Sequence, residues 1–259
     1  MRLTFLGTGT SFGVPVVGCD CDTCTSRDPR DARTRSGALL DLPGGRLLVD
    51  TPPELRLQLL RAAVDRVDAV WLTHPHADHL HGIDDLRIFT TRHRIVLPAY
   101  LAREHEDDVR RRFPYIFEDW APPPGTTRPS IELHPFDPGG PVEVLGARLH
   151  PLGLPHGPMT TYGFRVGGLG YITDAKRLPD PVLDTLAGVD TLVLNALWWG
   201  DPHPTHFNVE EAVAAAERVG AARTFLVHLT HRVRHRELEE RLPPGIRPAY
   251  DGLTLEVSP

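Results

Sequence analysis

Residues 73–79, Thr-His-Pro-His-Ala-Asp-His, constrain the fold of this chain more than any other segment. They follow the apolar run Ala69–Leu72, so four possible metal ligands stand within six positions at the end of a buried strand. Polar groups buried there without partners would cost several kcal/mol in total. A bound metal ion is the compensation that this residue set favours, whereas one histidine alone would carry no such implication.

The spacing of these ligands indicates two ions. His74 and His76, at positions i and i+2, point to the same side of an extended chain and can share one ion. Asp78 and His79 lie past the bend and can reach a second ion. Neutral imidazole together with carboxylate suits zinc or manganese, and ligand type alone leaves both open.

The composition of the 259 residues is that of a soluble globular protein. Hydrophobic residues make up 41%, and 28 Lys and Arg stand against 34 Asp and Glu, for a net charge of −6. The apolar fraction is too high and the net charge too small for a disordered chain. The acidic balance disfavours a general nucleic-acid-binding surface, which relies on Lys and Arg. We therefore expect one domain over residues 1–259 and no nucleic-acid partner.

The sequence contains no membrane or export signal. No apolar run approaches the ~18 residues that a membrane span needs, and the N-terminal MRLTFLGTGT reaches glycine before a signal-peptide core could form. We expect a cytoplasmic protein without a membrane partner. Cys19, Cys21 and Cys24 cannot form a paired disulfide framework, and in a reducing compartment their spacing favours metal ligands. Buried small side chains or redox thiols are the alternatives.

Short apolar or β-branched runs alternate with longer amphipathic segments. The pattern predicts strands at Arg2–Leu6, Gly37–Leu42, Arg46–Asp50, Ala69–Thr73, Ile95–Tyr100, Val142–Pro151, Thr161–Val166, Gly170–Thr173, Thr191–Asn195, Arg223–His228 and Leu253–Val257. It predicts helices at Pro53–Val64, Gly82–Phe89, Ala102–Phe113, Pro181–Leu186, Val209–Val219 and Arg236–Leu242. Asn208 and Glu211 have capping-box spacing, and Gly220 follows the same helix. Because strands outnumber helices and come in pairs, we expect an α/β protein with mixed sheets covered by helices.

The H-x-H-x-D-H run resembles the signature of the metallo-β-lactamase fold superfamily. Members carry, in chain order, an aspartate after an early strand, a third histidine, a bridging aspartate and a late histidine. Here the matching residues are Asp50, His156, Asp174 and His228, each at or just past the end of a predicted strand. The resemblance implies an αββα sandwich, two mixed β-sheets flanked by helices, with metals at one edge.

The same resemblance implies a dinuclear site. The expected ligands of one ion are His74, His76 and His156, and those of the other are Asp78, His79 and His228. Asp174 would bridge the two ions. Asp50 would hydrogen-bond a ligand and fix its orientation.

Five further segments narrow the resemblance. They are LGTGTSFGVPVVGCDCDTC near the N-terminus, FPYIF at 113–117, THFNVEEA from Thr205, HLTH from His228 and AYDGL from Ala249. Together they resemble the phosphoribosyl 1,2-cyclic phosphate phosphodiesterase group, relatives of tRNase Z. That group implies a homodimer and a structural zinc held by a C-x-C-x-x-C set and one late histidine. Here the ligands would be Cys19, Cys21, Cys24 and His231, a closed tetrahedral site, with His235 as the competing fourth ligand.

His206 matches a histidine that reaches the substrate phosphate in phosphodiesterase relatives, although His203 lies nearby and could be confused with it. The resemblance implies that His206 hydrogen-bonds a phosphoryl oxygen or protonates the leaving oxygen. Asp78 would orient the nucleophile, a hydroxide that bridges the two ions. The expected reaction is hydrolysis of a small phosphodiester, a cyclic ribosyl phosphate or a cyclic nucleotide. Trp198 and Trp199 could line the pocket mouth or pack under a loop.

Three other functions are compatible with parts of the sequence. A tRNase Z-like endoribonuclease would need an RNA-binding arm, and the one dense basic run, Val109–Arg112, favours a solvated helix face. A thioester or lactam hydrolase stays open because metal ligands alone do not select phosphorus over carbon. A non-catalytic metal-binding module is disfavoured because every expected ligand is present.

Overall fold

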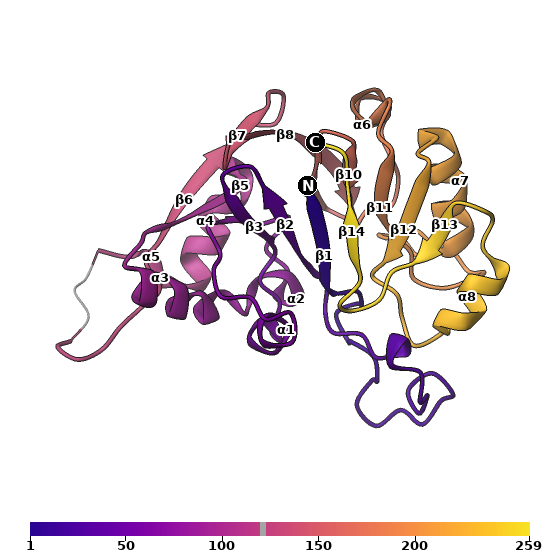
Figure 1. The fold of residues 1–259 in the computed structure, drawn as a ribbon, viewed down its shortest axis with the longest axis horizontal. Helices are drawn as coiled ribbons and strands as arrows, with labels where there is room; N and C mark the ends of the chain where they lie inside the picture. Colours follow the sequence, from indigo (N-terminus) through magenta and orange to yellow (C-terminus); the bar gives the residue numbers. More distant parts are fainter. Residues whose placement is uncertain (120–122) are drawn as a thin grey trace.

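Two seven-stranded β-sheets face each other in the computed structural model, and helices cover their outer faces (Figure 1). The structure describes residues 1–119 and 123–259. Three clusters of buried apolar side chains fill the layers, one between the sheets and one under the helices on each side. The αββα sandwich predicted from the sequence is confirmed.

The first sheet contains the first six strands and the last one. In spatial order its strands are β14 (Thr254–Glu256), β1 (Arg2–Gly7), β2 (Gly37–Leu42), β3 (Gly45–Val49), β4 (Ala69–Trp71), β5 (Leu97–Ala102) and β6 (Ile131–Phe136). The pairs from β14 to β3 are antiparallel, and those from β3 to β6 are parallel. The carboxyl ends of β3 and β4 therefore lie at the same edge.

The second sheet is also antiparallel in one half and parallel in the other. Its strands, in spatial order, are β13 (Ile246–Pro248), β12 (Arg223–Val227), β11 (Thr191–Asn195), β10 (Leu169–Tyr171), β9 (Met159–Val166), β8 (Ala147–His156) and β7 (Val142–Val144). The pairs from β13 to β10 are parallel, and those from β10 to β7 are antiparallel. The carboxyl ends of β10, β11 and β12 thus share one edge.

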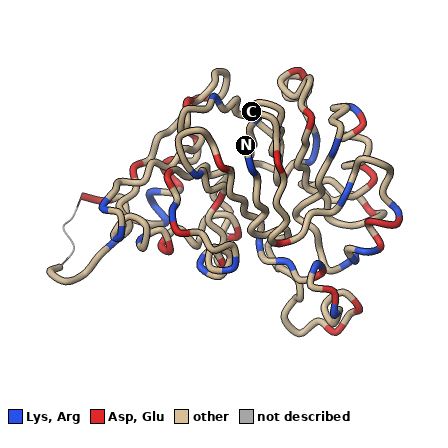
Figure 2. Tube along the Cα trace, in the orientation of Figure 1, with Lys and Arg blue, Asp and Glu red and all other residues tan. Residues whose placement is uncertain are grey.

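Helices connect the strands and cover both sheets. They are the 3-10 helices η1 (Pro29–Asp31) and η2 (Ile83–Leu86) and the α-helices α1 (Leu55–Arg61), α2 (Ala77–Leu80), α3 (Arg87–His93), α4 (Arg103–Arg112), α5 (Pro114–Phe117), α6 (Asp180–Leu186), α7 (Val209–Val219) and α8 (His235–Arg241). Charged residues of both signs are interspersed along the helices and loops (Figure 2). Within residues 1–119 and 123–259, no helix is long and apolar enough to cross a membrane.

Aromatic side chains fill the space between the two sheets. Trp71 stacks on Phe136 with ring centres 4.7 Å apart and meets Phe164 edge-on at 5.4 Å. Trp71 Nε1–H donates to the Tyr162 carbonyl oxygen at 2.8 Å, so its one polar atom is satisfied and β4 is tied to β9 of the opposite sheet. Each large side chain buried in this way contributes about 1.5–3 kcal/mol. The inner layer therefore fixes the two sheets relative to each other.

The start of α7 follows directly from its sequence. Asn208 Oδ1 accepts from the Glu211 backbone N–H at 2.8 Å, and the Glu211 carboxylate accepts from the Asn208 N–H at 3.0 Å. Gly220 ends the helix with a φ of 71°, a conformation that glycine adopts without strain. The helix predicted over Val209–Val219 is confirmed with both ends.

Several predicted elements are wrong in their details. The strand expected over Val142–Pro151 is two strands, β7 and β8, joined by Leu145 and Gly146 at φ values of 50° and 74°. Positive φ at both residues makes a tight hairpin turn that matches strand twist. The helix expected over Gly82–Phe89 is divided between η2 and α3. Strand β6 was not expected because Pro135 interrupts its pattern, yet β6 lies at the sheet edge, where proline is tolerated.

Candidate metal centre

Three polar residues after the carboxyl ends of β3, β10 and β12 have left-handed backbone conformations. The φ angles are 62° at Asp50, 53° at Asp174 and 58° at His228. Each such conformation costs a non-glycine residue about 1–3 kcal/mol, and proteins keep it mostly at functional sites. The three strand ends come from both sheets, so the sandwich concentrates backbone strain where the sheets' edges converge.

Thr73, the residue just before the first possible ligand in the segment after β4, is held by hydrogen bonds to both sheets. Thr73 donates to the Asp50 carboxylate twice, from its backbone N–H and from its Oγ1–H, each at 2.8 Å. The Thr73 carbonyl oxygen accepts from the Tyr162 N–H of β9 at 2.9 Å. These bonds hold the chain between the two sheets and set the position of residues 74–79.

One group of possible ligands consists of His74, His76 and His156, whose ring nitrogens lie within 4.8 Å of one another. His74 Nε2 and His76 Nδ1 are 2.9 Å apart. His156 Nδ1 lies 3.1 Å from the Thr205 carbonyl oxygen, so that nitrogen carries the hydrogen and Nε2 faces the group. Burial lowers the pKa of all three imidazoles. They are therefore neutral and offer lone pairs, as metal binding requires.

A second group consists of Asp78, His79, Asp174 and His228. His79 Nε2 lies 3.4 Å from Asp78 Oδ2, and His228 Nε2 lies 3.3 Å from Asp174 Oδ1. Both Nε2 atoms are buried and have no partner in hydrogen-bonding geometry among the residues described. Because buried polar atoms almost always have a partner, two such atoms facing the same carboxylates indicate that this group is built for a cation.

The electrostatics of the second group agree with that conclusion. Burial opposes charge on Asp78 and Asp174, yet the neighbouring imidazoles hold the pKa of both carboxyls below the ordinary range. Burial also opposes charge on His79, but the surrounding carboxylates raise its pKa well above the usual value. Two carboxylates that favour the charged form thus face one point of the fold, where they attract positive charge.

Asp174 lies between the two groups. Its Oδ2 is 3.8 Å from His74 Nε2 of the first group and 3.4 Å from His79 Nε2 of the second. One buried carboxylate therefore faces both groups, which is the geometry that a bridging ligand needs.

Asp50 contacts the second group through His79, on the ring nitrogen that faces away from the other ligands. Its Oδ2 accepts from His79 Nδ1–H at 2.7 Å, and its pKa is raised by burial, partly offset by His79. This bond fixes the tautomer of His79 and aims Nε2 at the second group. The orienting hydrogen bond that the resemblance implied for Asp50 is present in the structure.

His206 lies at the outer margin of both groups. Its Nε2 is 3.2 Å from Asp174 Oδ2, and its ring stacks on His228 with centres 4.8 Å apart. Thr205 Oγ1 lies 2.9 Å and His203 Nδ1 lies 3.2 Å from the other ring nitrogen. With Thr205 donating to Nδ1, Nε2 carries the hydrogen and can donate to an oxygen at the site. In the sequence no role is assigned to His203, but the loop before α7 brings it next to His206.

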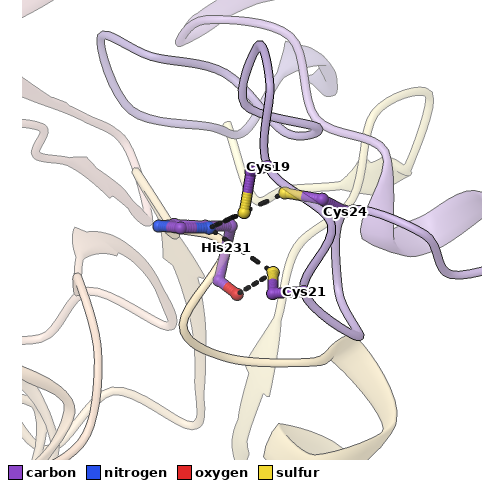
Figure 3. A group of neighbouring side chains, drawn as sticks. All are labelled: Cys19, Cys21, Cys24 and His231. Atoms are coloured by element: carbon purple, nitrogen blue, oxygen red, sulfur yellow. Dashed lines mark hydrogen bonds between the residues drawn. The ribbon is translucent and has the colours of Figure 1, made fainter.

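A separate cluster joins the N-terminal loop to the loop after β12 (Figure 3). The Sγ atoms of Cys19, Cys21 and Cys24 lie 3.3, 3.5 and 3.6 Å from His231 Nδ1. Hydrogen bonds, chiefly with the backbone at Cys24, lower the pKa of Cys21 to about 6, whereas burial raises that of Cys24 to about 11. The four ligand atoms form a closed set, and no other His, Cys, Asp or Glu among residues 1–119 and 123–259 joins it.

The geometry of this cluster fits zinc. With Zn–S near 2.3 Å and Zn–N near 2.0–2.1 Å, a tetrahedral ion separates sulfur from nitrogen by about 3.6 Å, close to the distances found here. His235, the competing ligand in the sequence, lies elsewhere: its Nδ1 is 3.2 Å from Arg33 Nη2 and its backbone N–H donates to Asp31. The structure therefore brings His231, and not His235, to the three sulfurs.

The two neighbouring tryptophans have different surroundings. Trp198 is partly exposed, and its ring centre lies 5.6 Å from that of His203 and 4.3 Å from the Arg232 guanidinium. Trp199 lies under Arg241 of α8 at 4.1 Å. Of the two roles left open in the sequence, Trp198 lies toward the site, and Trp199 packs against a helix. Arg232 was not singled out in the sequence, because nothing local indicates its contact with Trp198.

Comparisons with known proteins agree with this arrangement. A family model described as a beta-lactamase superfamily domain matches residues 45–229. A curated relative from Porphyromonas gingivalis, named octanoyltransferase, is 38% identical over 98% of this chain and 51% of its own length. A ribonuclease Z from a Bradyrhizobium species is 29% identical over 68% of this chain and 51% of its own. The chain thus spans about half the length of these curated relatives.

A solved structure matches over nearly the full length of both chains. It is described as a new diphosphatase from the PhnP family, with 37% identity, a TM-score of 0.91, and coverage of 99% of this chain and 98% of the other. The name octanoyltransferase is at odds with the hydrolase names, but the aligned segment is only about half of that relative. From the family match, the shared fold and the clustered ligands, we conclude that the chain belongs to the beta-lactamase superfamily and has the metallo-β-lactamase fold.

Proposed function

We propose that this chain is a metal-dependent phosphodiesterase that hydrolyses a small phosphodiester, a cyclic ribosyl phosphate or a cyclic nucleotide. The observation that carries the proposal is the position of Asp174, a buried carboxylate that faces both ligand groups while His206 Nε2 lies 3.2 Å from it. A two-ion site with an adjacent hydrogen-bond donor is suited to in-line displacement at phosphorus.

The proposal assigns the ligands as follows. One divalent ion would be held by His74, His76 and His156 and the other by Asp78, His79 and His228, with Asp174, which faces both groups, available to both ions. The ions are zinc or manganese, which imidazole and carboxylate both accept. When bound, they supply Lewis acidity toward the phosphoryl oxygens and make water acidic enough to serve as the nucleophile near neutral pH. A third ion, zinc, is held by Cys19, Cys21, Cys24 and His231.

The side chains contribute orientation and proton handling. Asp78, whose side chain is largely buried beside His79, orients the attacking water through its carboxylate. His206 donates from Nε2 to a phosphoryl oxygen or to the leaving oxygen, because Thr205 occupies the other ring nitrogen. Asp50 keeps His79 in the tautomer that binds metal. A Ser-His or Cys-His nucleophile is not required.

Two comparisons and the charge of the chain support phosphorus chemistry on a small substrate. The diphosphatase and the ribonuclease Z both carry names that denote cleavage at phosphorus. The net charge of −6 favours a small ester over RNA, whose binding draws on Lys and Arg. The name octanoyltransferase denotes acyl transfer, so acyl substrates belong in the test.

The test is a parallel assay of the purified protein with bis(p-nitrophenyl) phosphate, a cyclic ribosyl phosphate, precursor tRNA, S-lactoylglutathione and an octanoyl thioester. We expect turnover of the first two, loss of that turnover after chelation, and recovery with zinc or manganese. Thioester turnover without diester turnover would overturn the proposal. Preferred cleavage of precursor tRNA would replace it with the endoribonuclease.

The proposal also covers the compartment, the domain organisation and the oligomeric state of the protein. We place it in the cytoplasm, as one domain over residues 1–259 that forms a homodimer. Support for the first comes from three free cysteines in a metal-ligand arrangement, which a reducing compartment preserves. Support for one domain comes from the apolar core shared by both sheets. Light scattering at several concentrations tests the dimer, and a monomer mass at all of them would contradict it.

A further inference from the structure

Lys176 is the only lysine among the 28 Lys and Arg residues of the chain, and it lies two positions after Asp174. Its ammonium group donates to both carboxylate oxygens of Glu211, at 2.7 and 2.8 Å. The two side chains are partly buried, with exposures of 27% and 33%. An ammonium is a compact charge that fits between two carboxylate oxygens, whereas a guanidinium is a larger planar fork. The pair therefore joins the loop after β10 to the first turn of α7.

Glu211 has a second partner, which brings the ion pair close to His206. Its Oε2 also accepts from the Asn208 N–H at 3.0 Å, as part of the capping box of α7. Asn208 is buried and lies two positions after His206. Because one carboxylate binds both Lys176 and Asn208, the position of the ammonium group affects the residue at which the His206 loop joins the helix.

The backbone provides a second connection between the same two segments. The Phe207 N–H donates to the Ala175 carbonyl oxygen at 3.0 Å. Phe207 is the residue after His206, its side chain is buried, and Ala175 is the residue before Lys176. The His206 loop is thus held by one backbone hydrogen bond directly after the histidine and by the ion pair at the start of the helix.

Lys176 contacts a third segment of the site through its own backbone. Its N–H donates to the Pro155 carbonyl oxygen at 3.0 Å, and Pro155 is the residue before His156. His206 Nε2 lies 3.2 Å from Asp174 Oδ2 between these segments. One residue therefore connects the three chain segments that carry His156, Asp174 and His206.

We propose that Lys176, acting through Glu211, is a positioning residue that sets the place of His206 Nε2 relative to Asp174. The inference rests on the proposed function, in which His206 donates to the reacting phosphoryl group. A hydrogen-bond donor accelerates a reaction only when it reaches the reacting oxygen, and a displacement of about 1 Å can lower a rate about 10²-fold. The Lys176 ammonium group is directed to Glu211, so its effect on the rate passes through His206.

Two substitutions remove the ion pair in different ways. Lys176→Met keeps an unbranched apolar side chain and removes the charge. Glu211→Gln keeps an oxygen that can accept from the Asn208 N–H, so the helix cap remains while the ion pair is lost. We expect each to lower kcat for bis(p-nitrophenyl) phosphate about 10-fold and to change KM by less than about 2-fold, because the donor is needed in the transition state. Lys176→Arg, which keeps the charge, should recover part of kcat.

Arg218 provides a matched control, and a double-mutant cycle tests the route of the effect. Arg218 lies in the last turn of α7, at the opposite end from His206, and its guanidinium is 3.6 Å from the Asp180 carboxylate at the start of α6. Arg218→Met should therefore keep the native kcat. In a His206→Ala background, Lys176→Met should lower kcat no further, because two changes that act through one group are not additive. A further loss of about 10-fold in that background would overturn the proposal.

Amide hydrogen exchange gives a readout that does not depend on turnover. The Phe207 N–H, which is bonded to Ala175, should exchange at least about 10-fold faster in Lys176→Met and in Glu211→Gln than in the native protein. It should exchange at the native rate in Arg218→Met. A native kcat or a native exchange rate in both ion-pair variants would overturn the positioning role. Absence of diester turnover in the native protein would instead overturn the proposed function, so the two failures are distinguishable.

Discussion

The two ligand clusters of this chain are built in opposite ways. The His and Asp cluster lies at strand ends of both sheets, and its central residues are buried on a backbone that is strained at three positions. The cysteine cluster lies on an irregular loop, its residues are half-buried, and one histidine from a distant loop completes it. The packed sheets position the strand ends that carry the first cluster. The second has little packing of its own, so we expect its ion to supply the order.

Only three positions separate the clusters along the chain, because His228 belongs to one and His231 to the other. Leu229 between them is buried, and its N–H donates to the Thr8 carbonyl oxygen at 3.0 Å. The loop after β12 therefore contributes one residue to each cluster: His228 to the His and Asp cluster, and His231 to the cluster that holds the N-terminal loop. Four substitutions test whether the His and Asp cluster serves catalysis and the cysteine cluster serves stability.

Asp174→Ala should have the largest effect on activity. Removing the carboxylate that faces both groups should lower diester turnover by at least about 10³-fold, the equivalent of several kcal/mol of lost charge stabilisation. Metal analysis should find the two active-site ions lost and one zinc retained. Asp184→Ala, on an exposed position of α6, is the control. Full activity in Asp174→Ala would show that the bridge is misassigned.

His206→Ala should rank second. Loss of a hydrogen-bond donor at the reacting group should lower kcat by about 10²-fold, and the ions should remain because His206 is not among their proposed ligands. Steady-state kinetics together with metal analysis measure both. His150→Ala removes an exposed histidine away from the site and should behave as the native protein. A native kcat in His206→Ala would leave that histidine without a role in the reaction.

Asp50→Asn should have a smaller effect. Asparagine tolerates the left-handed backbone at this position, so the change removes mainly the charge that faces His79. We expect metal affinity or turnover to fall about 10-fold. Titration of the metal-free protein with zinc gives the affinity. An unchanged affinity would mean that the orientation of His79 does not depend on this carboxylate.

Cys21→Ser should affect activity least and stability most. Zinc content should fall by about one equivalent and the melting temperature by about 10 °C, since structural zinc contributes directly to folding. The active-site ions should remain. Asp20→Asn, on the exposed neighbouring position, controls for a change in the same loop. Unchanged metal stoichiometry in Cys21→Ser would contradict the second metal site.

Much of the site could be predicted because its residues carry local signals. Apolar strands that end in Asp50, Asp174 and His228 are visible in one sequence, and parallel strand ends converge in such folds. The tight spacing at His74 and His76 needs no tertiary knowledge. The sandwich itself came from resemblance to a known family, because alternating strands and helices alone do not specify how two sheets face each other.

Other features depend on contacts that no short segment encodes. The pairing of Arg232 with Trp198 arises from hydrogen bonds between two loops 33 positions apart. Strand β6 was missed because edge position, which makes Pro135 acceptable, is a property of the assembled sheet. The turn at Leu145 was missed because a leucine with positive φ is uncommon and Gly146 was absorbed into a continuous strand pattern.

The spread of the ligands along the chain has a consequence for biosynthesis. His74 and His76 emerge early from a ribosome, whereas Asp174 and His228 emerge only after most of the second sheet has been made. Domains fold as units when enough of the chain is present. A nascent chain can therefore carry all three histidines of the first group before the second group exists, and the second group is complete only once His228 has been added after β12.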